Sequence, residues 1–196
     1  MIFSPPALIL ASTSPYRRDL LARLALPFTV ERPDVEEHLV AGEPPRLRAE
    51  RLALAKAAAV SALHPHSVVI GADQVASCGA SILDKPGNAQ VARAQLQAQS
   101  GRSVHFHSAV AVVDRGRGTR ECFTDLTTVV MRTLSAADID AYIAADQPFD
   151  CAGSLRSEQL GISLCERIVS EDPSGLIGLP LIKLCVALRA CGYALP

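Results

Sequence analysis

The stretch Leu8-Ile9-Leu10-Ala11-Ser12-Thr13-Ser14-Pro15 joins an apolar, strand-like run to a turn rich in hydroxyl groups. Ser14 suits the N-cap of a helix and Pro15 its first position, so a helix is expected to begin here, with Arg17 and Arg18 in its first turn. Backbone N–H groups at a helix start attract anions, and a guanidinium offers phosphate a planar fork of donors. The stretch therefore predicts a strand–turn–helix unit with a phosphate site. A capped surface helix with solvated arginines explains this stretch alone equally well.

Beyond this unit, apolar runs alternate with helical patterns along the 196-residue chain. We expect strands at Ala7–Ala11, Phe28–Glu31, Ser67–Val75, Ser103–Val113, Cys122–Thr133 and Ile162–Ile168. We expect helices at Pro15–Leu24, Pro44–Ala62, Ala89–Gln99, Ala136–Ala145 and Leu179–Ala190. Ser135–Asp138 has the pattern of a capping box, and Arg115–Gly118 that of a hairpin turn between two long strands. The whole pattern predicts one α/β domain over residues 1–196, with a mixed sheet.

The composition narrows the classes of function. Hydrophobic residues make up 49% of the chain, which suffices for a substantial core, and a net charge of −1 argues against general nucleic-acid binding. No uncharged apolar stretch approaches the roughly 20 residues of a membrane span, and the N-terminus lacks the basic start of a signal peptide. The six cysteines form no CxxC pair and are expected to be small buried apolar residues. We therefore expect a soluble cytoplasmic protein without membrane or nucleic-acid partners.

The sharpest candidate for chemistry is a carboxylate inside an apolar strand. Asp73 interrupts the run Val68–Val75, and a buried charge is costly unless it is paired or bound to a metal. It is therefore predicted to be a catalytic or metal-binding acid, with a strand-end cap as the alternative. Lys56 is the only cation in the apolar segment Leu52–Leu63, which hints at a function, although snorkelling to solvent also explains it.

Further charged groups lie in segments without helical or strand periodicity. Glu37 belongs to the acidic segment Asp34–Glu37, whose oxygens suit Mg²⁺ or Mn²⁺, and Lys85 lies in the turn Asp84–Asn88, where it offers a point charge to phosphate. Solvated loops are the plainer interpretation of each segment alone. Cys151–Glu158 combines small residues with a cation and a carboxylate, which predicts a functional loop. The five histidines form no convincing triad, and the chain contains neither a P-loop nor a GxGxxG motif.

Taken together, five segments resemble the Maf family of nucleoside triphosphate pyrophosphatases, and most closely its YceF-type branch, the 7-methyl-GTP pyrophosphatases. The segments are Leu8–Arg18, Ile70–Val75, Lys85–Gly87, Cys151–Glu158 and Asp172–Ile182. The resemblance covers nearly the whole chain. It implies a mixed, elongated sheet flanked by helices, with a cleft between two lobes. Members of the family are often dimeric, so a homodimer is a further expectation.

The reaction implied by this resemblance cleaves a nucleotide between its α- and β-phosphates and releases a monophosphate and pyrophosphate. It uses a divalent cation, Mg²⁺ or Mn²⁺. The resemblance makes Asp73 the proton acceptor, and Asp73 and Glu37 the metal ligands. Lys56 and Lys85 are the implied catalytic cations.

The substrate-binding positions follow from the same resemblance. Ser12 and Arg17 are the implied phosphate contacts. Tyr16, Gln74 and Glu158 match the 7-methyl-GTP branch, whereas dTTP- and UTP-cleaving relatives carry Arg, Thr and Gln at these positions. A cationic methylated base stacks well on an aromatic ring, and a carboxylate accepts hydrogen bonds from guanine N1–H and N2–H. The branch usually has Trp where this chain has Tyr16, which would weaken the stacking.

Two other functions are open at this point. One is a dTTP/UTP pyrophosphatase of the same family, which the residues at the three branch positions disfavour. The other is a nucleotide-sensing regulator of cell division with little catalysis, which the intact set of Asp73, Lys85 and Glu37 disfavours.

Overall fold

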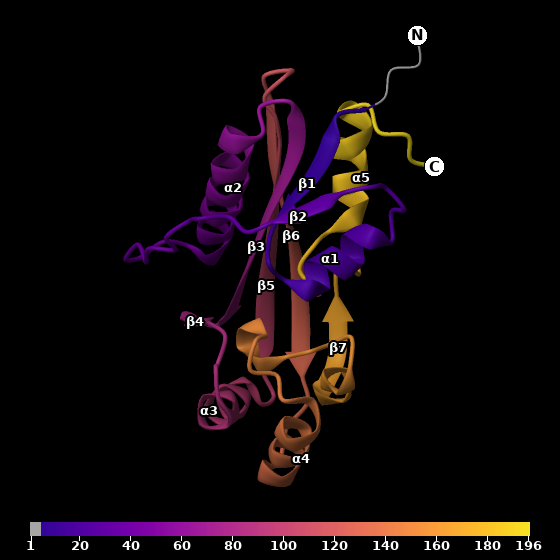
Figure 1. Cartoon of the computed structure of the whole chain (residues 1–196). Helices are drawn as coiled ribbons and strands as arrows, with labels where there is room; N and C mark the ends of the chain where they lie inside the picture. The colour runs from indigo at the N-terminus through magenta and orange to yellow at the C-terminus, as the bar shows by residue number, and fades with distance from the viewer. Residues whose placement is uncertain (1–4) are drawn as a thin grey trace.

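The structure, a computed structural model, describes residues 5–196, so the first four residues of the predicted domain 1–196 lie outside it. Within the described residues, seven strands form one mixed sheet (Figure 1). The strands are β1 (Ala7–Ala11), β2 (Thr29–Glu31), β3 (Ser67–Cys78), β4 (Ser81–Leu83), β5 (Ser103–Asp114), β6 (Thr119–Met131) and β7 (Cys165–Val169). The α-helices are α1 (Pro15–Ala22), α2 (Pro45–Leu63), α3 (Ala89–Gln99), α4 (Ala136–Asp146) and α5 (Leu181–Ala190). Two 3₁₀ segments, η1 (Ala152–Ser154) and η2 (Leu160–Leu164), precede β7.

The strand order is β2-β1-β3-β5-β6-β7, with β4 added to one end of β3. β1 runs parallel to β2 and β3, whereas β3, β5, β6 and β7 pair with one another in antiparallel fashion. β1 pairs with β3 only as far as Gly71, and β4 begins to pair with the same edge at Ala76. Between them, no described strand covers this edge of β3 over residues 72–75. This edge of β3 is therefore free of strand pairing at this point.

The two faces of the sheet are covered by different helices. Side chains alternate across a strand, so Leu8 and Leu10 of β1 pack on α1 and α5, while Ile9 and Ala11 pack on α2. The same alternation in β3 puts Ile70 on the α1 and α5 side. Figure 1 shows α2 on one side of the long strands and α1 and α5 on the other.

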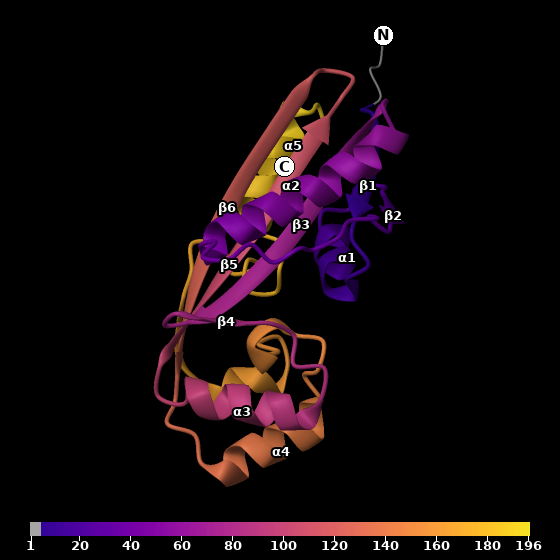
Figure 2. The ribbon, with the colours of Figure 1, turned by 90° about the vertical axis from the view of Figure 1, so that its left-hand side faces the viewer.

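A third apolar cluster lies at the opposite end of the long strands. It combines α3 and α4 with the ends of β5 and β6, through buried side chains such as Leu96, Phe106 and Tyr142. Figure 2 shows α3 and α4 gathered at one end of the elongated molecule and α1, α2 and α5 at the other. The molecule therefore has two lobes joined by continuous strands, which confirms the expected fold class.

Most expected elements are present, with three corrections. Ser135 and Asp138 form the predicted capping box at α4, and the β5–β6 hairpin turns at the predicted residues. The strand expected from Ile162 is wrong in its first half, because η2 occupies that segment and β7 begins at Cys165. β4 was not expected, since three residues are too few for a periodic pattern.

The third correction concerns the cysteines. All six are free thiols, but only Cys78 and Cys191 are buried, and Cys122 is exposed. The expectation of small buried apolar residues therefore holds for two positions. Within residues 5–196, no helix combines the length and apolar character that crossing a bilayer requires.

Candidate active site

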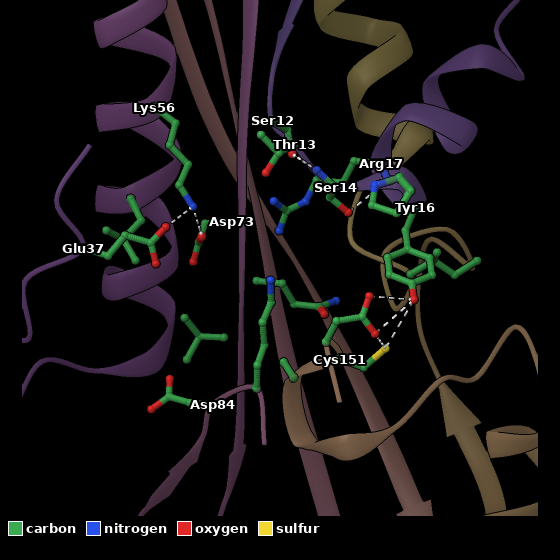
Figure 3. A pocket seen from close by; sticks show the side chains of 18 of the residues that line it. Ser12, Thr13, Ser14, Tyr16, Arg17, Glu37, Lys56, Asp73, Asp84 and Cys151 are labelled. Atoms are coloured by element: carbon green, nitrogen blue, oxygen red, sulfur yellow. Dashed lines mark hydrogen bonds and ion pairs between the residues drawn. The ribbon is translucent and has the colours of Figure 1, made fainter. Parts of the chain in front are cut away.

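A single cavity of about 730 Å³ opens at the uncovered edge of β3, between the two lobes. All nine residues singled out from the sequence line it: Ser12, Tyr16, Arg17, Glu37, Lys56, Asp73, Gln74, Lys85 and Glu158. They come from both ends of the chain and from several elements. Figure 3 shows Lys56, Glu37 and Asp73 on one side of this cavity and Tyr16 and Cys151 on the other.

The open edge of β3 explains why these residues meet. Asp73 and Gln74 lie on β3 where neither β1 nor β4 pairs with it, so both reach the cavity although they are successive residues. Ser12 follows the last residue of β1, beside the same gap. In open α/β sheets, ligands commonly bind beyond the carboxyl ends of strands where neighbouring strands part.

A close approach between α2 and β3 brings Lys56 to Asp73. A Cβ atom added to Gly71 would lie 2.3 Å from the carbonyl oxygen of Ala53 and 2.5 Å from the amide nitrogen of Ala57, so only glycine permits this contact. Asp73 lies two residues further along β3 and faces the same side. The glycine therefore sets the spacing at which the lysine of the helix reaches the carboxylate of the strand.

Lys56 joins two carboxylates. Its Nζ lies 2.6 Å from Asp73 Oδ1 and 2.6 Å from Glu37 Oε1. The side chains of Lys56 and Asp73 are 11% and 10% exposed, whereas that of Glu37 is 50% exposed. Burial alone would raise the pKa of Glu37, but the hydrogen bond from Lys56 and the nearby Lys85 and Arg17 hold that pKa below its ordinary value. The three groups form a compact charged centre on the α2 side of the cavity.

The start of α1 supplies donors on the other side of the gap. The Ser14 hydroxyl caps the helix by accepting a hydrogen bond from the Arg17 amide at 3.4 Å, as the sequence predicts. The Arg17 Nε donates to the carbonyl of Gly178 at 3.1 Å, which fixes the guanidinium against the loop before α5. Burial lowers the pKa of Arg17, an effect that Asp73 and Glu37 oppose. Arginine still keeps its charge at neutral pH.

Hydrogen bonds fix the side-chain amide of Gln74 in place. Its Nε2 donates to the Ser108 hydroxyl at 2.9 Å and to the carbonyls of Leu176 and Gly175 at 2.9 and 3.2 Å. These bonds tie β3 to the loop that also binds Arg17. They use the amide N–H groups and leave the Gln74 carbonyl oxygen as the group to offer a ligand.

Tyr16 lies at the opposite end of the cavity from Lys56. Its hydroxyl donates to the Asp150 carboxylate at 3.0 and 3.2 Å, and the Cys151 thiol donates to the same carboxylate at 3.5 Å. Burial is the largest of the effects that raise the pKa of Cys151 to about 11, so this group is a neutral thiol at pH 7. Partial removal from water also raises the pKa of Glu158 above its ordinary value.

The Maf family model, described as "Maf-like protein", matches residues 7–191. The chain belongs to the Maf family.

Curated relatives at about 50% identity match this Maf-family chain over most of its length. One from Polaromonas sp., named 7-methyl-GTP pyrophosphatase, is 52% identical over 96% of this chain and 86% of its own. One of the same name from Bordetella pertussis is 54% identical over 92% of this chain and 89% of its own. A solved structure from Vibrio cholerae covers 95% of this chain and 99% of its own with a TM-score of 0.45 and 9% identity, which is too remote to bear on fold or function.

The cavity of this Maf protein also contains charged residues that sequence reasoning missed. Arg32, Arg48 and Asp150 line it, and Arg48 pairs with Asp84 at 3.1 Å. Arg32 and Asp150 lie in loops, where a charge is ordinary and gives no signal. Arg48 lies in the first turns of α2, where the sequence pattern indicates an ordinary solvated helix residue.

The donor set of this Maf protein fits a hard divalent cation. Five cationic and five anionic side chains line the cavity, so these walls do not by themselves neutralise a triphosphate. Glu37 and Asp73 are paired carboxylates, and the described residues contain no group of three or more His, Cys, Asp or Glu side chains placed to hold a metal. Mg²⁺ typically binds one or two carboxylates and completes its shell with water and substrate phosphate. Two carboxylates in a cavity that also contains five cationic side chains fit this pattern.

Proposed function

We propose that this Maf-family protein hydrolyses a nucleoside triphosphate, with 7-methyl-GTP as the preferred substrate, between the α- and β-phosphates. The products are the nucleoside monophosphate and pyrophosphate. The observation that carries the proposal is the convergence of a buried acid, Asp73, with cations from α1, α2 and the segment before α3 in one cavity. The names of the relatives from Polaromonas and Bordetella support the choice of substrate.

The phosphate end of the cavity supplies part of the charge that neutralises the triphosphate and holds it in place. Arg17, Lys85 and Lys56 supply positive charge, and the capped start of α1 turns backbone N–H groups toward the same space. Hydrolysis of a phosphoanhydride depends mainly on positioning and on stabilisation of charge at the phosphoryl oxygens. Arg17 is suited to this work because Gly178 fixes its guanidinium in advance.

Glu37 and Asp73 are the residues that would hold a divalent cation, Mg²⁺ or Mn²⁺. When bound, such an ion supplies charge neutralisation and lowers the pKa of water. Lys56 lies between the two carboxylates and holds them together.

Asp73 is the group placed to accept the proton of the attacking water. Its carboxylate is buried at the open edge of β3, so a water in the cavity reaches it from the substrate side. Lys56 donates to Oδ1 and leaves Oδ2 as the oxygen for the proton. A base positioned in this way contributes on the order of 10²- to 10⁴-fold to a rate.

The base end of the cavity carries Tyr16, Gln74 and Glu158. The Tyr16 ring offers a face for stacking a cationic base, and the Glu158 carboxylate offers an acceptor for guanine N1–H and N2–H. Because the Gln74 amide group is already committed to Ser108 and the 175–176 carbonyls, Gln74 contributes an acceptor oxygen. We further propose that the chain works as a single-domain cytoplasmic enzyme and associates as a homodimer.

A pyrophosphate-release assay with a nucleotide panel tests this proposal. The panel contains 7-methyl-GTP, GTP, dTTP and UTP with Mg²⁺ or Mn²⁺. The expected result is pyrophosphate release that is fastest with 7-methyl-GTP and abolished by chelating the metal. Fastest release from dTTP or UTP would assign the protein to the other branch of the family, and binding without release would favour a nucleotide-sensing regulator.

A further inference from the structure

Two residues hold Tyr16: Asp150, which lines the cavity, and Arg156, which lies behind its wall. The Arg156 guanidinium lies 5.6 Å from the centroid of the Tyr16 ring, and its NH2 donates to Asp150 Oδ1 at 3.0 Å. Asp150 accepts in turn from the Tyr16 hydroxyl. The three side chains thus form a closed set of contacts between α1 and the loop that follows α4, 134 residues apart in sequence.

Arg156 covers one face of the Tyr16 ring. Its side chain is 16% exposed and donates to the backbone carbonyl of Asp146 at 3.0 Å, so it is anchored independently of the tyrosine. Tyr16 and Asp150 line the cavity, whereas Arg156 does not. The covered face of the ring therefore points away from the cavity, and only the other face is available to a base.

The charges at this end of the cavity are unbalanced. Arg156 pairs with the Asp150 carboxylate at 3.0 Å, and the charges of Arg156, Asp146 and Asp150 all act on Glu158, so three carboxylates stand against the guanidinium of Arg156. Burial alone would raise the pKa of Asp150, but hydrogen bonds from Tyr16 and Arg156 hold it below its ordinary value, so Asp150 is ionised at neutral pH. This end is negative.

The other end has the opposite balance. Arg17, Lys56 and Lys85 act together on Glu37, and with Asp73 they leave an excess of positive charge. The cavity is therefore polarised, with a positive end for phosphate and a negative end for a base. A nucleotide whose base is itself cationic complements both ends, whereas a neutral base complements one.

We propose that Asp150 and Arg156 determine base specificity: together they hold the Tyr16 ring with one face toward the cavity, and the charge of Asp150 makes that face selective for a base that carries a positive charge. Arg156 acts through Tyr16 and is a positioning residue, while Asp150 lies at the cavity wall itself. The inference rests on the proposed function, and it adds two residues outside the positions that match the family branch.

The test compares 7-methyl-GTP with GTP, which differ by the charge that methylation places on the base. Asp150→Asn keeps the acceptor for the Tyr16 hydroxyl and removes the charge. We expect it to lower the kcat/KM ratio of 7-methyl-GTP to GTP about fivefold, through KM for the methylated nucleotide, as suits a half-exposed charge near the ligand. Arg156→Gln removes the group that covers and holds the Tyr16 ring, so it should lower the ratio as well.

Asp19→Asn is the matched control. Asp19 lies on α1 like Tyr16, its side chain is 67% exposed and paired with Arg18, and it is outside the cavity lining. This variant should leave the ratio unchanged. Equilibrium binding of both nucleotides is measured in parallel on every variant, so the test does not depend on turnover.

A lower ratio in both Asp150→Asn and Arg156→Gln supports the inference, because a purely structural role would weaken both nucleotides alike. Equal losses on both nucleotides, or an Asp19→Asn effect as large as that of Asp150→Asn, would overturn it. If the wild-type protein binds both nucleotides but cleaves neither, the proposed function fails, and the affinity ratios still decide the roles of Asp150 and Arg156.

Discussion

Replacing Lys56 with Met tests whether its ammonium stabilises the charged centre that it forms with Asp73 and Glu37. Met follows the path of the lysine side chain and removes only the ammonium. The Asp73 side chain, which is only 10% exposed, then loses the Lys56 ammonium that lies 2.6 Å from its carboxylate. Removing one member of a buried ion pair costs about 3–5 kcal/mol, and we expect the lower figure, about 3 kcal/mol at pH 7, because Arg17 still acts on Asp73.

The assay compares the free energy of unfolding of the wild-type protein and Lys56→Met by urea denaturation, with Lys183→Met as the control. Lys183 is 42% exposed and lies 3.8 Å from a Glu171 side chain that is 86% exposed, so its loss should change the free energy of unfolding by less than about 0.5 kcal/mol. At 2–4 °C for each kcal/mol in a chain of this size, Lys56→Met should lower Tm by about 6–12 °C. A Lys56→Met protein within about 1 kcal/mol of wild type would refute the reasoning.

The same variant makes a second prediction about metal. The Lys56 ammonium lies between the carboxylates of Glu37 and Asp73, so it competes with any cation that they would bind. Lys56→Met should therefore bind Mn²⁺ at least about tenfold more tightly in the absence of nucleotide, a change of about 1.4 kcal/mol. Electron paramagnetic resonance of free Mn²⁺ measures this directly. Unchanged affinity would mean that the two carboxylates are not the metal ligands.

Two further predictions concern packing and pH. Gly71→Ala should destabilise the protein by about 3 kcal/mol in chemical denaturation, because its Cβ would meet the α2 backbone at 2.3 Å. The control is Gly116→Ala, which should cost far less because the nearest contact of its Cβ is at 3.4 Å. Similar costs for the two variants would contradict the argument that β3 and α2 approach closely at Gly71. The pKa of Glu158 is raised, so this carboxylate loses its charge as pH falls through a value above the ordinary 4.5. As pH falls through that range, the preference for 7-methyl-GTP over GTP, measured as the ratio of their kcat/KM values, should decline in the wild-type protein and stay constant in Glu158→Gln. If this ratio depends on pH in the same way in both proteins, Glu158 is not the recognition group.

The fold was predictable from the sequence wherever a pattern was long. The continuous apolar runs of β1 and β3, and the many strong helix formers of α2, place these elements correctly. The pattern failed at Ile162 because a short apolar run fits a 3₁₀ turn as well as a strand. Short elements have too few residues to show a period.

The site was predictable only in part, for a related reason. Asp73 and Lys56 each stood out as a charge among apolar residues, but their pairing depends on the contact at Gly71, which no local pattern shows. Asp150 gave no signal, because it lies in a turn without periodicity and its partner Tyr16 is 134 residues away in sequence. Residues that act through tertiary partners become visible only when the chain is folded.

The central claim is that Asp73 accepts the proton of the water that cleaves the α–β phosphoanhydride. The most direct measurement is the turnover of 7-methyl-GTP by Asp73→Asn, followed as pyrophosphate release, together with the affinity of the same protein for the nucleotide. We expect turnover to fall by at least about 100-fold while the affinity changes by less than about threefold, since the phosphate-binding cations remain. Near-normal turnover in this variant, or release of orthophosphate in place of pyrophosphate by the wild-type protein, would contradict the account.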